Sequence, residues 1–245
     1  MTNRKIVIAE KGKGRKKKTE PEPVQETEET EEVKEEELSE EELQQELEAL
    51  MSAMAPQKSP ASELRVAQLY GEIDDKMATD IISAFLILKE SGREDVLEEG
   101  SEEPTTIYHP FELIISTPGG TAVDMFSIYD VMRQTEEKCE IHTYGLGRVM
   151  SAGVVLLAAG TKGKRKIGAN CRVMIHSVIG GHHGAIHDLE NEMEEVRWVQ
   201  EQYNKALCAE TDLTPRMLKK LMSRNVNVYL TAQEAVEYGI ADIIV

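Results

Sequence analysis

Cysteine is rare in this 245-residue sequence, and its three copies, Cys139, Cys171 and Cys208, form no pair with metal-site spacing. An odd number of cysteines without such spacing argues against a disulfide scaffold and against a zinc knuckle. A long apolar run is also missing, because the longest, residues 149–159, is interrupted and is too short to cross a bilayer. We therefore expect a soluble cytoplasmic protein without a membrane anchor or a signal peptide.

Basic residues are outnumbered, since 28 Lys and Arg face 45 Asp and Glu and the formal net charge is −17. Such a protein is repelled by phosphate backbones and by anionic lipid, so we expect neither nucleic acid nor a membrane as a partner. The excess charge is local: fifteen acidic residues and one basic residue, Lys34, lie between Glu20 and Glu48.

Residues 1–60 have the composition of a charged appendage, with too few apolar side chains to offset the entropy of ordering. We predict a largely disordered N-terminal tail there. Leu43, Leu47 and Leu50 nevertheless recur at helical spacing behind a capping box of Ser39 and Glu42, which predicts a short helix over 39–54. The folded domain is expected over 61–245.

Strand-like and helix-like segments alternate through this domain, which predicts an α/β fold with a parallel or mixed sheet and helices outside. The expected strands are 64–70, 111–116, 141–144, 166–167, 172–175 and 243–245. The expected helices are 75–90, 123–134, 186–208 and two that open at Thr214 and Thr231. Residues 91–108 predict a surface loop, and 145–153 a turn that leads into a short apolar helix ending at Gly160.

Ser151 lies where a strand-like segment turns through a glycine-bearing loop into a helix. A serine in such an elbow is exposed, and the first helical amides, beginning with Ala152, converge near it and can stabilise an oxyanion. Serine needs a neighbouring base to become a nucleophile. The local pattern is not the G-x-S-x-G elbow, so a small residue chosen for tight packing remains the alternative.

His176 ends an apolar strand and is followed by Ser177 and a glycine-rich piece. Histidine is the natural proton shuttle near neutral pH, so it is the candidate base, although a structural histidine at a strand end is the alternative. Gly119-Gly120 follows another strand and suggests a second oxyanion donor, or else an ordinary turn.

A cluster of His182, His183, His187 and Asp188 raises the question of a metal site. No carboxylate or cysteine ligand completes it with a recognisable spacing. We expect no metal and no other cofactor.

Several motifs in order resemble the Clp protease proteolytic subunit from about residue 64 to residue 245. They are YGEID at 70–74, STPGG at 116–120, MSAGVVLLAAG at 150–160, TKGKR at 161–165, RVMIH at 172–176 and LTAQEAVEYGIAD at 230–242. The resemblance implies a Clp protease/crotonase-like fold, built from repeated β-β-α units with a protruding handle helix.

The resemblance also implies an activity, a serine-type endopeptidase that hydrolyses unfolded polypeptides inside an oligomeric barrel. Ser151 would be the nucleophile, His176 its base, and the amides of Gly120 and Ala152 the oxyanion hole. The segment from Gly180 through residues 186–208 would be the handle that docks two heptameric rings into a tetradecamer. An AAA+ Clp ATPase unfoldase would feed the barrel and use the ATP.

One position departs from the family pattern. The family's third triad member is an aspartate shortly before Leu-Thr-Ala, and here Asn227 takes that place. An amide still accepts from an imidazole N–H but stabilises an imidazolium poorly. In chymotrypsin-type serine proteases, replacing the aspartate by asparagine lowers kcat roughly ten-thousand-fold. The residue 91–108 segment is also longer than usual for the family, and the acidic tail is foreign to it.

Three other functions stay open. A catalytically weakened structural or regulatory subunit of the same barrel fits Asn227. A crotonase-like acyl-CoA enzyme shares the fold class and needs no Ser–His pair. A membrane signal-peptide peptidase would use a Ser–Lys pair and an anchor, and neither is evident.

Overall fold

The computed structural model describes residues 64–97, 103–223 and 227–245, all within a compact unit that runs from Ala61 to Val245. The predicted tail and its helix over 39–54 lie outside the described residues. The strands are β1 (Val66–Tyr70), β2 (Arg93–Val96), β3 (Thr105–Tyr108), β4 (Phe111–Thr117), β5 (Ile141–Met150), β6 (Lys166–Ile167), β7 (Arg172–Ile175), β8 (Val228–Leu230) and β9 (Ile243–Ile244). The helices are α2 (Asp75–Ser91), α3 (Ala122–Glu136), α4 (Ala152–Ala158), α5 (Ile186–Glu210), α6 (Pro215–Met222) and α7 (Ala232–Glu237).

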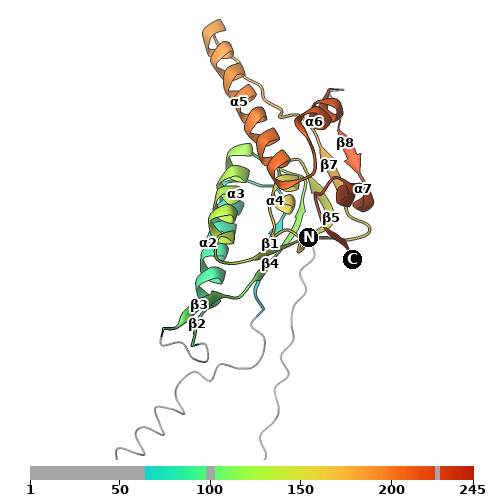
Figure 1. The fold of residues 1–245 in the computed structure, drawn as a ribbon. Helices are drawn as coiled ribbons and strands as arrows, with labels where there is room; N and C mark the ends of the chain where they lie inside the picture. The colour runs from blue at the N-terminus through green and yellow to red at the C-terminus, as the bar shows by residue number, and fades with distance from the viewer. Residues whose placement is uncertain (1–63, 98–102, 224–226) are drawn as a thin grey trace, which may run out of the picture. The chain divides into compact units, whose positions relative to one another are not determined.

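Seven of the described strands form one mixed sheet, and the α/β prediction is confirmed (Figure 1). Strands β1, β4, β5, β6 and β9 lie side by side and all pair in parallel. Strand β5 forks: its early residues pair with β6, and its last three pair with β7. Strand β8 then adds to β7 in the antiparallel direction. Strands β6 and β7 thus pair with different parts of β5.

Strand β5 is longer than predicted, because it continues from Tyr144 to Met150 through two glycines. Its register against β4 shifts between the pairs Ile115–Gly145 and Thr117–Val149, and Gly147 has φ +62°. This bulge takes up extra residues while the strand goes on, as glycine in the left-handed region permits. The predicted turn at 145–153 is therefore wrong, and Ser151 follows directly after a strand.

Helix α4 is the centre of the core. All seven of its residues, Ala152 to Ala158, are buried, as expected for a helix that is apolar on every side. Helix α5 packs on it through Tyr203, Ala206 and Leu207, which are buried at helical spacing. The first residue of α4 is thus held on a rigid element, and it immediately follows Ser151.

The segment 91–108 and helix α5 both contain more regular structure than the sequence predicts. Residues 91–108 contain the antiparallel pair of β2 and β3 instead of a loop without structure. Helix α5 has 25 residues, and its first turns project beyond the rest of this unit (Figure 1). In the described ranges, no helix is both long and apolar enough to cross a membrane.

Candidate active site

Ser151 has an unusual backbone. Its φ is 53° and its ψ is −122°, and it is the one non-glycine residue in the described part of the chain with a positive φ. Holding an L-residue in such a conformation costs about 1–3 kcal/mol and requires support from its surroundings. The amide of Ser151 donates to the carbonyl of Met174 at 2.8 Å, and its carbonyl accepts from Val154 N at 3.0 Å. Its side chain makes no capping hydrogen bond to α4.

Tyr203 supplies a third restraint that the sequence reasoning missed. Its hydroxyl donates to the Ser151 carbonyl at 3.2 Å. The side chain is buried against α4, and this burial raises the pKa of the phenol. The hydroxyl is therefore protonated and can only donate to that carbonyl. Helical spacing in α5 indicated a buried tyrosine, but nothing in that spacing named its partner.

Neighbouring atoms approach the backbone so closely at positions 119 and 120 that only glycine fits there. Gly119 has φ +102°, and a Cβ there would lie 2.6 Å from the Cβ of Ser151 and 3.1 Å from its Oγ. A Cβ on Gly120 would lie 2.0 Å from the carbonyl oxygen of Ile73. Ile73 anchors this loop, since its amide donates to Gly119 O and its carbonyl accepts from Thr121 N, both at 2.9 Å. A larger residue at either glycine would displace the loop from Ser151.

Two backbone amides beside Ser151 are available for a ligand. Within the residues that the structure describes, neither Gly120 N nor Ala152 N donates a hydrogen bond to protein. Ala152 is the first residue of α4, where an amide has no intrahelical partner and the helix dipole is positive. Both residues line one cavity with Ser151 and His176. Two such donors can hold an oxygen that becomes negatively charged.

This cavity has a volume of about 630 Å³. Its walls come from the loop that leads into α3, the Ser151 elbow, the segment after β7 and one side of α5. The lining side chains are mostly apolar, with Glu192 and Glu195 of α5 on one side. The structure therefore brings the predicted nucleophile, the predicted base and both predicted oxyanion donors to one cavity.

His176 directly follows β7, and its Nδ1 lies 2.5 Å from the carbonyl oxygen of Ser177. A carbonyl oxygen only accepts, so in the neutral ring this contact places the proton on Nδ1 and the lone pair on Nε2. No hydrogen bond joins His176 to Ser151 within the described residues, although catalytic hydrogen bonds are often long in a structure without substrate.

Asn227 lies just before β8, which pairs with β7 in the antiparallel direction. Val173 pairs with Leu230, Met174 with Tyr229 and Ile175 with Val228. One further step in this register would bring Asn227 opposite His176, but the paired residues end at Ile175 and Val228. Asn227 is exposed, and it is not the residue that contacts Nδ1 in this structure.

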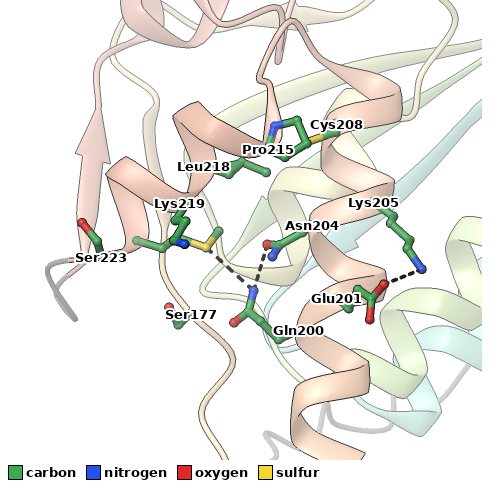
Figure 2. A pocket seen from close by; sticks show the side chains of 11 residues that line it. Ser177, Gln200, Glu201, Asn204, Lys205, Cys208, Pro215, Leu218, Lys219 and Ser223 are labelled. Atoms are coloured by element: carbon green, nitrogen blue, oxygen red, sulfur yellow. Dashed lines mark hydrogen bonds and ion pairs between the residues drawn. The ribbon is translucent and has the colours of Figure 1, made fainter.

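A second cavity, of about 730 Å³, lies behind the segment that follows His176, between α5 and α6 (Figure 2). Ser177 stands at one side of it, and Nε2 of Gln200 lies 2.9 Å from Oδ1 of Asn204 and 3.7 Å from the sulfur of Met222. Sequence reasoning assigned no role to these residues.

Metal-binding groups do not gather anywhere in the described ranges, where no three His, Cys, Asp or Glu side chains are placed to hold an ion. In the histidine-rich segment, His187 Nδ1 lies 3.3 Å from a carboxylate oxygen of Glu190, one turn further along the exposed start of α5.

Residues 57–245 match the family model described as Clp protease. The match covers the whole of the described domain, including the Ser151 elbow, the Gly119-Gly120 loop, His176 and α5. This chain belongs to the Clp protease family.

Proposed function

We propose that this chain is a serine-type endopeptidase, the proteolytic subunit of an ATP-dependent Clp protease. The observation that carries the proposal is the combination at Ser151. Its backbone is strained and left-handed, and it lines the cavity together with two residues, Gly120 and Ala152, whose amides are unpartnered in the described part of the chain. Strain of this kind is kept where the surroundings enforce it, as in active sites.

The chemistry assigns one role to each group. Ser151 Oγ attacks the carbonyl carbon of the scissile peptide, and its proton passes to Nε2 of His176. The carbonyl oxygen becomes an oxyanion between the amides of Gly120 and Ala152. The C–N bond then breaks as Nε2 returns the proton to the leaving amine. Water repeats the sequence on the acyl-enzyme and releases the carboxylic acid and free Ser151.

The surface of α5 supports assembly into a barrel. Its exposed side carries Ile186, Leu189 and Met193, which are 73%, 40% and 52% exposed. A row of half-exposed apolar side chains on a projecting helix is typical of an interface. We propose that α5 docks two heptameric rings, that the barrel encloses the cavities, and that a cytoplasmic AAA+ unfoldase delivers unfolded polypeptides to them.

A fluorophosphonate probe tests the enzyme proposal. The assembled protein is expected to be labelled on Ser151 and to lose all labelling in Ser151→Ala. If the protein is assembled and folded but peptide mapping finds no adduct on Ser151, the enzyme proposal is wrong.

A second candidate is a catalytically weakened subunit that scaffolds or regulates active partners. Asn227 favours it, because an amide stands where an aspartate would orient and stabilise the imidazolium. Labelling of Ser151 together with slow peptide turnover, restored by Asn227→Asp, would support this candidate. Full turnover without that substitution would exclude it.

A further inference from the structure

We propose that Gln200 is a positioning residue that orients His176 through the Ser177–Val178 peptide unit. This unit would take the place of a direct carboxylate partner. The inference rests on the proposed role of His176 as the base, and it names a residue of α5 to which that role assigns no part.

The first step is the contact of Nδ1 with the carbonyl of Ser177, at 2.5 Å. It selects the imidazole tautomer that carries its proton on Nδ1 and keeps Nε2 free to accept one from Ser151. In a Ser-His-Asp enzyme, the buried aspartate selects this same tautomer. Here a main-chain carbonyl does so, and its orientation decides which way the ring points.

The second step is that this carbonyl is not free to turn. The Ser177 C=O and the Val178 N–H belong to one planar peptide unit and point in opposite directions. The Val178 N–H donates to Oε1 of Gln200 at 2.7 Å. Any rotation of the peptide plane breaks both hydrogen bonds together, so Gln200 holds the carbonyl against His176.

The third step is that Gln200 is itself held in one orientation (Figure 2). Its Nε2 donates to Oδ1 of Asn204, one turn further along α5, at 2.9 Å. The same nitrogen lies 3.7 Å from the sulfur of Met222 on α6. The Gln200 nitrogen faces two acceptors and the Gln200 oxygen faces one donor, so all three contacts fix the same orientation of this amide. The chain of contacts thus runs from α6 and α5 to the imidazole.

The surroundings make this arrangement testable by substitution. Gln200, Asn204, Met222 and Ser177 all line the 730 Å³ cavity between α5 and α6. Water can enter such a space and bond a polar group that loses its partner. Removing the Gln200 amide is therefore expected to leave a folded protein in which the peptide unit is free to rotate.

The kinetic test compares three variants of the full chain in assembled form. Gln200→Met keeps length and helix propensity but loses the acceptor oxygen. On a fluorogenic peptide, kcat is expected to fall by up to about 100-fold with KM nearly unchanged, since misplacement of a catalytic group affects the chemical step. Gln200→Glu keeps an acceptor for the Val178 N–H and is expected to recover most of the loss.

The matched control is Gln202→Met, which makes the same change two residues along the same helix. Gln202 is also half-buried, but it faces the groove toward α3. Its kcat is expected to equal that of the unmodified protein. An unchanged kcat in Gln200→Met, or a Gln200→Glu variant as slow as Gln200→Met, would overturn the inference.

A double-mutant cycle that combines Gln200→Met with Asn227→Asp tests whether the Ser177–Val178 peptide unit takes the place of a carboxylate. An aspartate at position 227 competes for the Nδ1 proton, so Gln200→Met is expected to cost less in that background. An equal fold-loss in both backgrounds contradicts the claim that the peptide unit takes the place of the carboxylate.

Crystal structures of the unmodified protein and of Gln200→Met separate this inference from the proposed function. The Ser177 carbonyl is expected to leave Nδ1 in the variant, whatever the activity. If the carbonyl stays, the inference is wrong even when Ser151 reacts with fluorophosphonate. If Ser151 never reacts but the carbonyl moves, the enzyme proposal fails and the positioning role of Gln200 stands.

Discussion

Ile175 pairs with Val228 in the antiparallel ladder of β7 and β8, and these are the last paired residues before His176 and Asn227. We propose that a carboxylate at position 227, one step further in this register, would face the imidazole. Asn227→Asp is expected to raise kcat/KM for peptide hydrolysis by about tenfold or more, because a carboxylate stabilises the imidazolium that forms in the reaction. Steady-state kinetics on a fluorogenic peptide measures the change.

Asn170→Asp is the matched control for this gain. Asn170 is exposed in the turn between β6 and β7, so the substitution adds the same charge outside the candidate site. Its kcat/KM is expected to remain that of the unmodified protein. An equal rise in both variants would mean that added negative charge, and not its place at position 227, produces the effect.

Gly119→Ala is expected to abolish labelling of Ser151 by fluorophosphonate. Its Cβ would lie 2.6 Å from the Cβ of Ser151, so either the loop or the nucleophile must move. Gly71→Ala is the control, because Gly71 has nearly the same φ, +105° against +102°, and open space around its Cβ. Both variants are expected to lose about 1–2 kcal/mol of stability through the left-handed backbone.

The two measurements to compare are the labelling rate and the midpoint of thermal unfolding. Gly71→Ala is expected to be less stable but to label at the normal rate. If Gly119→Ala also labels normally while folded, the close approach of Gly119 to Ser151 is not needed for reaction.

The sequence predicted the members of the candidate site better than the course of the chain around them. Residue type alone left Ser151 and His176 open to a structural role, and the order of the surrounding motifs favoured them as a catalytic pair; the structure places both beside one cavity with Gly120. The end of β5 could not be predicted, because Gly145 and Gly147 are typical of a turn. Pairing with neighbouring strands carries β5 on to Met150, which is a tertiary effect that overrides local preference.

Two other misses have different physical causes. The hairpin of β2 and β3 is polar and exposed on nearly every residue, so no period of two marks its strands. The contacts of Tyr203 and Gln200 are specific to this three-dimensional arrangement. Helical spacing shows that such side chains face inward, but it does not show that one reaches Ser151 and the other Val178.

Tyr203→Phe tests whether the restraint on Ser151 matters to catalysis. Loss of the hydrogen bond to the Ser151 carbonyl is expected to cost about 1 kcal/mol of stability and to lower kcat, because the strained elbow relaxes. Tyr129→Phe is the control. Tyr129 also donates a part-buried hydrogen bond, to Glu210 at 2.8 Å, and burial raises the pKa of its phenol as well.

Chemical denaturation and steady-state kinetics on both variants give the answer. Similar losses of stability are expected, with kcat reduced in Tyr203→Phe alone. A normal kcat in Tyr203→Phe would show that the hydrogen bond stabilises the fold and does not position Ser151.

Asp242 and Arg165 form the most buried ion pair of the described domain, and they predict how its stability depends on pH. The Arg165 side chain is 4% exposed and donates to Asp242 through Nε at 2.8 Å and through a second nitrogen at 2.5 Å. Partial burial by itself raises the pKa of Asp242, but hydrogen bonds from Arg165 and from the Gly163 amide hold it below its ordinary value.

A carboxyl whose pKa is lower in the folded state than in the unfolded state stabilises the fold above the unfolded value. That contribution is lost as the pH falls through the folded pKa. Asp242→Asn, which leaves the buried Arg165 charge without its carboxylate, is expected to cost about 3 kcal/mol or more at pH 7. The difference between the two proteins should shrink as the pH drops below the ordinary range of an aspartate, near 4. Urea denaturation at pH 7 and at pH 3 measures it, and a difference that stays constant would mean that Asp242 does not carry the acid-dependent part of the stability.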